Sequence, residues 1–187
     1  MLIPVLIFSL LGNGRGSEEL VIAPVEVAKN ELTLRPKLGK WFYRDKAFTG
    51  YTMVYHPNGA IAERMGYYQG KKQGRTQKWF ADGTLRRWAT YHANRLNGRV
   101  RSWWPNGVLS MESNYVDGVA HGVQRKWYPN GQLARQTRLN LGREEGMQQA
   151  WLRNGKLYAN YEARDGRFFG LKRSNLCYAL EDEVVQR

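Results

Sequence analysis

Glycine recurs every 24 residues over most of this chain, with no insertion or deletion between any two copies. The column consists of Gly50, Gly74, Gly98, Gly122, Gly146 and Gly170. With 20 glycines in 187 residues, five further matches in one register would arise by chance roughly once in 10^5 trials. The chain is therefore expected to fold as a row of like units, each of which contacts only its neighbours.

Two further columns place a turn at each end of every unit. Glycine follows asparagine or aspartate in Asn58-Gly59, Asp82-Gly83, Asn106-Gly107, Asn130-Gly131 and Asn154-Gly155. Such pairs are the strongest short signal for a β-hairpin. The other column contains only residue types that tolerate positive φ: Gly70, Asn94, Gly118, Gly142 and Gly166. Each unit is therefore predicted to be a β-hairpin.

An aromatic and an aliphatic column lie between these turns. The aromatic column is Tyr55, Trp79, Trp103, Trp127 and Trp151, and the aliphatic one is Ile61, Leu85, Leu109, Leu133 and Leu157. One hairpin of 24 residues buries too little apolar area to be stable alone in water, so neighbours must pack together. We predict an all-β fold: an elongated antiparallel ribbon or solenoid of five β-hairpin repeats, preceded by half a repeat. The aromatic column is predicted to be its buried inner row, and the glycine column to supply backbone angles or close approach.

The repeat domain is expected over residues 40–170. Residues 40–46 fit the second half of a repeat, because Tyr43 continues the tyrosine column 24 residues before Tyr67. The fifth repeat has drifted, since Arg153 replaces the proline that precedes Asn-Gly in other repeats. Terminal units of solenoids commonly drift in this way and act as caps.

The flanking segments receive separate predictions. Residues 18–39 are expected to form a lead-in with one or two strands, of which one lies in residues 20–27 and ends or bends at Pro24. Residues 171–187 are expected to form a C-terminal cap, with a strand or a helix over residues 178–185.

Two stretches carry a resemblance to a known family. In the first, Pro57-Asn58-Gly59 follows Tyr55, and in the second, Pro129-Asn130-Gly131 follows Trp127-Tyr128 and precedes Leu133. They resemble the bacterial variant of the MORN repeat, and the resemblance covers about residues 40–170. It implies a repeat protein that associates with other proteins or with membranes. Proteins of this kind are often catalogued as antitoxin components of toxin–antitoxin systems.

The positive charge of the chain belongs to the repeats. The formal net charge is +13 at pH 7, and the basic and acidic residues of 1–39 and of 171–187 cancel. Residues 40–170 contain 22 basic and nine acidic residues and so hold the whole surplus. A surface of this kind attracts polyanions and speeds the encounter with acidic proteins, anionic lipid or nucleic acid.

The predicted binding surface combines aromatic and basic columns. Phe80, Trp104 and Tyr128 follow the inner row by one residue and are expected to point to the opposite face. The basic residues assigned to this surface are Arg75, Arg99, Arg101 and Arg125. The alternative for the aromatic residues is packing beneath a neighbouring loop or against a second ribbon. For the basic residues it is a solvated face that keeps the ribbon soluble.

A non-enzymatic scaffold is the leading function that these patterns predict. It would bind another protein, expected to be acidic, along the basic surface or by strand addition at an exposed edge of the sheet. An antitoxin-like, partner-binding protein is one form of this function. Peripheral association with anionic membrane lipid is one alternative, and a glycan- or choline-type binding repeat is another. Nucleic acid is less favoured, because the tryptophans occupy the most regular column, as structural residues do. The repeat pattern does not decide the oligomeric state.

Residues 1–17 have the pattern of an export signal. An apolar run over residues 2–11 is too short to span a bilayer and is followed by small residues that suit a cleavage site. An ordinary buried strand is the alternative, because no basic residue precedes the run. We expect a periplasmic or extracellular protein rather than a cytoplasmic one. The single cysteine, Cys177, excludes an intrachain disulfide and is expected to be a buried small hydrophobe.

The sequence shows no constellation of catalytic or metal-binding residues. His56, His92 and His121 occupy three different columns and are interpreted as tolerated variants. No pair has the spacing of metal ligands, and Cys177 has no persuasive histidine partner. The adjacent acids Glu144 and Glu145 are expected at a loop or turn. We therefore predict no enzyme activity, no metal and no cofactor.

Overall fold

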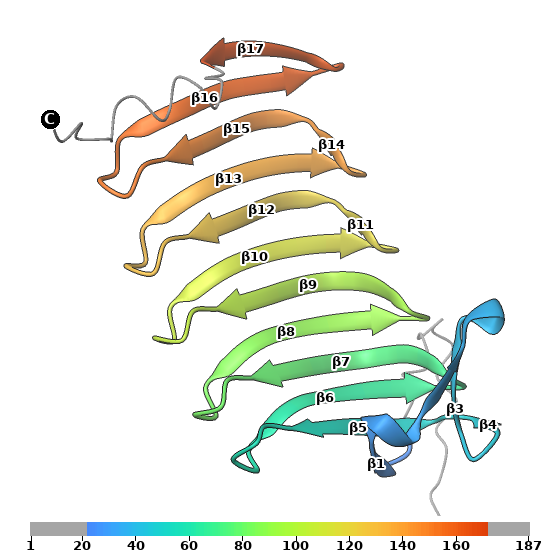
Figure 1. Cartoon of the computed structure of the whole chain (residues 1–187). Helices are drawn as coiled ribbons and strands as arrows, with labels where there is room; N and C mark the ends of the chain where they lie inside the picture. The colour runs from blue at the N-terminus through green and yellow to red at the C-terminus, as the bar shows by residue number, and fades with distance from the viewer. Residues whose placement is uncertain (1–21, 172–187) are drawn as a thin grey trace, which may run out of the picture.

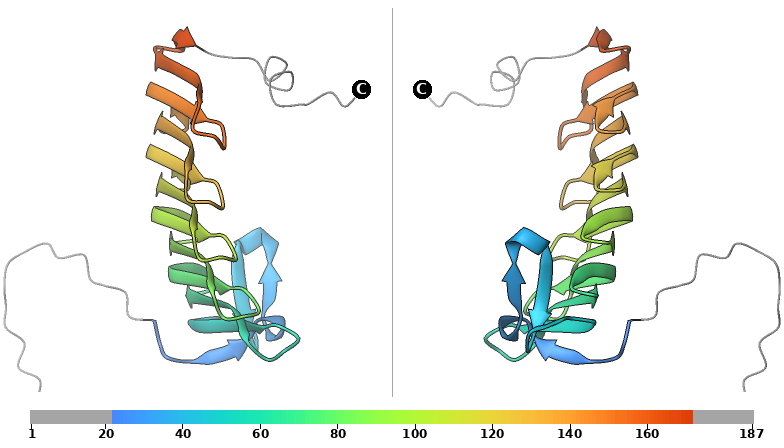
Figure 2. Two further views of the ribbon diagram at one scale, coloured as in Figure 1. Left: turned by 90° about the vertical axis from the view of Figure 1, so that its left-hand side faces the viewer. Right: turned by 90° about the vertical axis from the view of Figure 1, so that its right-hand side faces the viewer.

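The repeats form one long sheet in the computed structural model, which describes residues 22–171 (Figure 1). The sheet has 14 strands, and every pairing in it is antiparallel except that of β1 with β5. Seen edge-on, the ribbon is a single layer (Figure 2). The predicted export signal, Cys177 and nearly all of the predicted C-terminal cap lie outside the described residues.

The large sheet is built from strands of two to nine residues. They are β1 (Glu26–Ala28), β5 (Gly50–Tyr55), β6 (Ile61–Tyr68), β7 (Lys71–Trp79), β8 (Leu85–His92), β9 (Arg95–Trp103), β10 (Leu109–Val116), β11 (Val119–Ala120), β12 (Gly122–Trp127), β13 (Leu133–Asn140), β14 (Arg143–Glu144), β15 (Gly146–Trp151), β16 (Leu157–Arg164) and β17 (Arg167–Leu171). Each repeat contributes one hairpin, and the hairpins pair edge to edge in chain order. The predicted all-β hairpin ribbon is confirmed.

The Asn-Gly pairs close three-residue loops. In the first, the His56 N–H donates to the Ala60 carbonyl at 2.8 Å, and the Gly59 N–H donates to the His56 carbonyl at 2.9 Å. Gly59 has a φ of 82°. This is the geometry of a type I turn followed by a left-handed residue, not of the two-residue turn that Asn-Gly most often forms. The same two backbone bonds recur in all five repeats, in the register of the sequence.

The turns at the opposite end of the hairpins contain two residues with positive φ. Gln69 and Gly70 have φ angles of 47° and 79°, as a type I′ turn requires. The Gly70 N–H donates to the Phe48 carbonyl at 2.7 Å, which ties this turn to the preceding repeat. Equivalent bonds join Asn94 to Lys72, Gly118 to Leu96 and Gly142 to Ala120.

The 24-residue glycine column lies where the strands are irregular. All six members have positive φ. Around Gly98, Ala89 pairs with Val100 and Tyr91 pairs with Leu96, so residues 97–99 form a bulge opposite Thr90. A bulge residue with left-handed φ favours glycine, and a bulge bends and twists its strand. The pairing is interrupted in the same way around Gly74, Gly122 and Gly146, whereas Gly170, in the last strand, pairs regularly with Tyr161.

The lead-in folds over the first hairpin instead of extending the ribbon. It comprises β1, the 3₁₀ helices η1 (Lys29–Glu31) and η2 (Pro36–Leu38), and a separate sheet of β2 (Thr33–Arg35), β3 (Lys40–Tyr43) and β4 (Lys46–Ala47). The prediction that residues 40–46 form half a repeat of the ribbon is therefore wrong, because β3 and β4 belong to the separate sheet. β1 pairs parallel with β5 and takes the edge position that a preceding repeat would have occupied.

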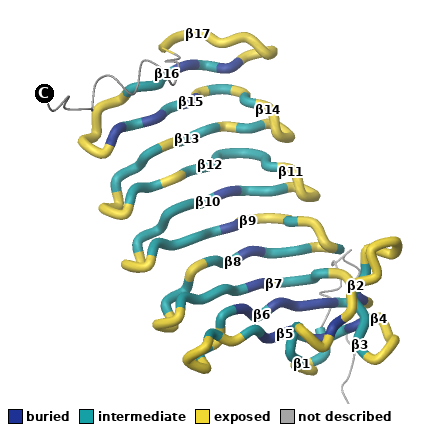
Figure 3. Tube along the Cα trace, viewed as in Figure 1, coloured by how far each residue is buried: buried dark blue, intermediate teal, exposed yellow. Residues whose placement is uncertain are grey.

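The core does not follow the predicted aromatic row. Tyr55 is 56% exposed, and the four tryptophans of the column are only half-buried. At mid-strand, buried residues form two paired columns (Figure 3): Thr52, Thr76, Val100 and Gln148, and opposite them Met65, Ala89, Ser113 and Tyr161. The aromatic column is near the strand ends, where a single layer has little to cover it, so the prediction of a buried inner row is wrong.

A cluster at the N-terminal end holds the lead-in on the ribbon. Leu32 and Phe48 pack with Met65 and Tyr67, and Trp41 lies against them. The Trp41 and Tyr67 rings meet edge to face, with centroids 6.3 Å apart. Burial raises the pKa of the Tyr67 hydroxyl to about 12. A fully buried aromatic side chain contributes about 2–3 kcal/mol, so this cluster anchors the lead-in.

Candidate binding surfaces

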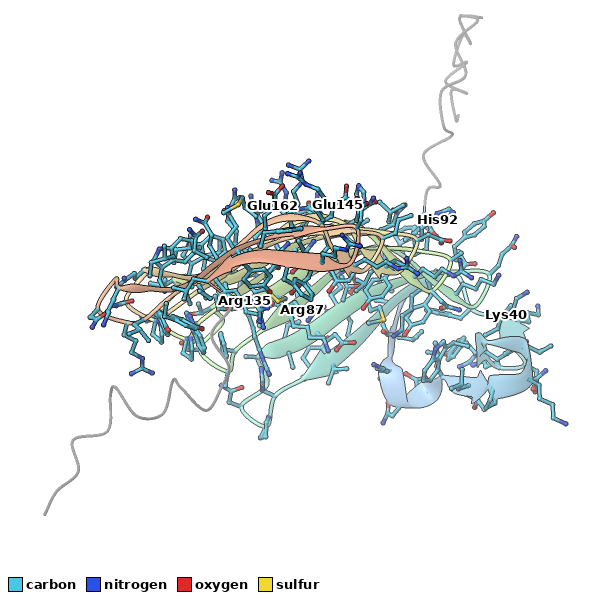
Figure 4. All side chains as sticks on the ribbon, turned by 90° about the horizontal axis from the view of Figure 1, so that it is seen from above. Lys40, Arg87, His92, Arg135, Glu145 and Glu162 are labelled. Carbon is cyan, nitrogen blue, oxygen red and sulfur yellow. The ribbon has the colours of Figure 1, made fainter. Side chains whose placement is uncertain are left out.

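The sheet has two faces, which the strand register assigns. Directly paired residues of an antiparallel sheet share a face, and neighbours along a strand alternate. Arg87 pairs with both Lys78 and Ser102, whereas Arg101 pairs with Trp88 and Glu112. We call these sides the Arg87 face and the Arg101 face. Arg87 and Arg135 lie on one side of the ribbon and Glu162 on the other, and the lead-in sheet stands on the side of Arg87 (Figure 4).

Three of the four arginines predicted for the binding surface converge on one carboxylate of the Arg101 face. The Arg101 Nε lies 2.7 Å from Glu112 Oε2, and Arg99 and Arg125 approach the same carboxylate to 3.9 Å and 3.8 Å. The Glu112 side chain is 16% exposed, and those of the arginines are 40–52% exposed. This group, here the Glu112 cluster, carries a surplus of two positive charges.

The fourth predicted arginine extends the same face. Gln77 pairs with Trp88, which lies on the Arg101 face, and Arg75 is two residues from Gln77 on the same strand, so Arg75 lies on that face as well. Its guanidinium lies 5.4 Å from the Trp88 ring centroid. By strand alternation, Trp79 lies on the side of Arg75 and Gln77. The Arg101 face therefore combines arginines with the half-buried Trp79 and Trp88.

The aromatic residues predicted for the binding surface bridge repeats. The Trp104 Nε1–H donates to the Trp127 carbonyl at 3.0 Å, and the Tyr128 hydroxyl donates to the Trp151 carbonyl at 2.9 Å. Phe80 and Trp104 line a groove on the Arg87 face together with Lys78. The predicted surface is thus divided, because its arginines lie on one side and these aromatic residues contact the other.

The histidines that the sequence marked as variants have structural contacts. His56 Nε2 lies 3.0 Å from the Trp79 carbonyl, at the repeat position that Trp104 and Tyr128 use for the same bridge. The Leu141 N–H donates to His121 Nδ1 at 3.4 Å, across the two-residue turn. His92 lies 3.5 Å from the Gln73 amide. The sequence analysis missed the bridging role of His56. The signal was present, because Trp104 and Tyr128, which both carry a hydrogen-bond donor, occupy the same position of the repeat.

The two adjacent acids lie at the end of a short strand. Glu144 ends β14, and Glu145 joins it to β15. The Tyr161 hydroxyl donates to Glu144 at 2.9 Å, and Arg135 lies 3.7 Å from the same carboxylate. Burial and the bond to Glu144 raise the pKa of Tyr161 to about 12. These contacts join neighbouring hairpins.

A groove of about 800 Å³ lies on the Arg87 face near the lead-in. It crosses five neighbouring strands, which contribute Met65 from β6, Lys72 from β7, Tyr91 from β8, Ser102 from β9 and Ser110 from β10. Lys29 of η1 also lines it, so the lead-in forms part of the wall. Sequence reasoning did not find this groove, because its wall comes from a segment with no repeat signature.

Charge in the groove is predominantly positive. Glu63 is bonded to Lys29 at 3.2 Å and to Lys78 at 2.6 Å, and its side chain is 10% exposed. Burial raises the pKa of Glu63, but the bonds and charges of the two lysines outweigh it and lower the pKa below the usual value. Burial, with repulsion by Lys29 and Lys78, lowers the pKa of Lys72.

Among the described residues, 22–171, no group of three or more histidine, cysteine, aspartate or glutamate side chains could hold a metal ion. The same residues contain no helix long and apolar enough to cross a membrane. The Arg87 face and the Arg101 face are two extended surfaces rich in arginine, lysine and aromatic side chains.

Part of the ribbon matches a known protein family. No curated protein matches the chain. Residues 96–117 and 120–138 match the family model described as "MORN repeat variant". These segments cover most of β9, β10, β12 and β13, in the middle of the ribbon. MORN repeats are generally repeats for protein or membrane interaction and are not a known enzyme family. The match and the hairpin ribbon together support a MORN-repeat protein.

Proposed function

We propose that the protein is a non-enzymatic scaffold that binds an acidic protein partner across the Arg101 face. The observation that carries this proposal is the Glu112 cluster, in which three partly exposed arginines share one carboxylate. This excess of positive charge favours the binding of a carboxylate from a partner, because a guanidinium can bind a carboxylate through two parallel hydrogen bonds. Electrostatic attraction of this kind mainly raises the association rate and selects the partner.

The tryptophans of the same face supply the apolar part of the proposed interface. Interface energy is concentrated in a few residues, and Trp, Tyr and Arg are enriched among them. Trp79 and Trp88 are half-buried on this face, so a partner can contact their rings beside the arginines. An antitoxin-like role, with a toxin as the acidic partner, is the finer form of this proposal and is motivated by the family resemblance.

Affinity capture with the full tagged chain, followed by binding measurements on the captured protein, tests the proposal. The test variant is Arg99→Gln, Arg101→Gln and Arg125→Gln, since glutamine avoids placing new carboxylates beside Glu112. The control is Lys126→Gln, Arg135→Gln and Arg153→Gln, which removes the same charge elsewhere. We expect the dissociation constant to rise about tenfold or more for the test variant and less than about twofold for the control. Equal effects would overturn the proposed face.

Association with an anionic membrane surface is the second candidate. The last strand, β17, exposes Phe168, Phe169 and Leu171 by 47–53% and begins with Arg167. Apolar side chains beside basic ones suit the interface of an anionic bilayer. Liposome flotation at low and high salt decides this, and absence of binding to phosphatidylserine vesicles at low salt would exclude it.

A further inference from the structure

The groove on the Arg87 face is open and elongated. It runs from β6 to β10, across four strand spacings of about 4.8 Å, or about 19 Å in all. An extended peptide advances about 3.3 Å per residue, so about six residues would fill this length. The dimensions suit a stretch of extended chain better than a compact ligand.

The cations of the groove outnumber its acids by five to one. Lys29, Lys72, Lys78, Arg86 and Arg87 line it, and Glu63 is the single acidic lining residue. Glu63 is already bonded to Lys29 and Lys78. Within the described part of the chain, Lys72, Arg86 and Arg87 form no salt bridge with a carboxylate, although the charge of Glu63 acts on Lys72 from a distance. The groove therefore presents three cations that an incoming anion could neutralise.

Aromatic rings accompany the unneutralised cations. Arg86 lies 5.6 Å from the Phe80 ring centroid, and Lys72 lies 5.5 Å from that of Tyr91. Trp104 lines the groove as well. The lowered pKa of Lys72, caused by burial and by its basic neighbours, means that a nearby negative charge would stabilise its ammonium form. The lining thus fits a chain that alternates carboxylates with apolar side chains.

We propose that this groove binds an extended acidic segment of the protein partner, about six residues long, with at least three aspartates or glutamates and one aromatic or aliphatic residue. The carboxylates pair with Lys72, Arg86 and Arg87, and the apolar side chain lies against Phe80 or Trp104. The inference rests on the proposed function in taking the partner to be an acidic protein, but it assigns a second contact on the other face of the ribbon.

Fluorescence anisotropy with a labelled peptide tests the groove directly. The probe is an eight-residue peptide with six glutamates, one phenylalanine and one leucine, titrated with the full chain at low salt. Arg87→Ala and Lys72→Ala each remove one unneutralised cation, and we expect either to weaken binding about tenfold. The matched control is Arg135→Ala, because Arg135 has the position of Arg87 two repeats later and lies outside the groove lining. It should change the affinity less than about twofold.

Three results would overturn the inference. The first is the absence of saturable binding, and the second is an equal loss for Arg135→Ala and Arg87→Ala, which would show attraction to the total charge only. The third is displacement of the peptide by inorganic tripolyphosphate at far lower concentration than by unlabelled peptide, which would indicate a site for a compact polyphosphate. Unchanged thermal unfolding of Arg87→Ala confirms that a loss of binding is not a loss of folding.

The affinity of the captured partner for these variants distinguishes a failure of the groove inference from a failure of the proposed function. If the partner binds the Arg87→Ala and Lys72→Ala variants as tightly as the wild type but loses affinity for the Glu112-cluster variant, only the groove inference fails. If no acidic protein is captured by the wild-type chain, the proposed function fails.

Discussion

Thr52, Thr76, Val100, Gln124 and Gln148 occupy one position of the repeat, two residues after the glycine column, and they show how one site tolerates different chemistry. Gln148 is 1% exposed, and its amide is bonded to the Arg138 backbone and to the Gly146 carbonyl. Gln124 makes equivalent bonds around Gly122. In the first repeats the side chain is shorter, and Thr76 Oγ1 has no hydrogen-bond partner among the described residues.

We expect Thr76→Val to raise the free energy of unfolding by about 1 kcal/mol, because a buried hydroxyl without a partner costs free energy that an isosteric methyl does not. Val100 occupies the same column with 0% exposure, so the column accepts valine. Denaturant unfolding measures the change. Val100→Thr is the reverse substitution and should lower the free energy of unfolding by about 1–2 kcal/mol. Destabilisation by Thr76→Val would show that its hydroxyl is bonded after all.

At the scale of the element, the asparagines of two Asn-Gly loops, Asn58 and Asn106, each join neighbouring repeats. Asn106 Oδ1 accepts the Val108 N–H at 3.2 Å, while its Nδ2 donates to the Pro129 carbonyl of the next loop at 2.8 Å. Asn58 does the same within its loop and to Ala81. Asp82 accepts the Thr84 N–H at 2.8 Å, which lowers the pKa of its carboxyl, but a carboxylate has no N–H to donate.

Asp82→Asn should therefore stabilise the ribbon. The new amide keeps the bond from Thr84 and gains a donor toward the Pro105 carbonyl, 23 residues on, as at Asn58 and Asn106. One added hydrogen bond is worth about 0.5–1.5 kcal/mol, which thermal or denaturant unfolding can measure. Asn106→Asp is the matched opposite change and should destabilise by a similar amount. If both substitutions left stability unchanged, the bond between loops would contribute nothing.

The whole molecule is a stack with unequal ends. Its N-terminal end is covered by β1 and the lead-in, and Tyr67 and Thr52 near that end have 0% exposure. At the other end all five residues of β17 are exposed. In a linear array each unit is stabilised only by its neighbours, so an end unit with one neighbour opens most easily.

Native-state hydrogen exchange should accordingly show a gradient. Amides of β6–β9 are expected to exchange more slowly than those of β16 and β17. Trp41→Ala, which removes the ring packed against Tyr67, should speed exchange in β5 and β6 while leaving β15 and β16 nearly unchanged. Uniform protection along the ribbon would contradict this and show that the repeats unfold as one unit.

The hairpins, their turns and their 24-residue phase are readable from the chain alone, because turn chemistry is local. Asn-Gly after proline and glycine at positive φ specify the backbone path without reference to distant residues. The burial of a residue, in contrast to its turn chemistry, depends on residues that are distant in the chain. Trp79 and Trp103 follow the pattern of a core, yet a single layer leaves strand ends half-covered, and only the assembled sheet shows that Thr76 and Val100 lie deeper.

Tertiary structure alone decided which side each residue faces and where the ribbon is enclosed. The side of Arg101 and the side of Arg87 follow from register and bulges, which depend on pairing across the sheet. The half repeat at 40–46 keeps the tyrosine of the pattern but pairs with β2, because the lead-in offers it an alternative strand. The groove likewise needs Lys29 beside Glu63, 34 residues apart. The periodic sequence determined the repeating unit, whereas contacts between residues far apart in the chain determined its faces, its core and its groove.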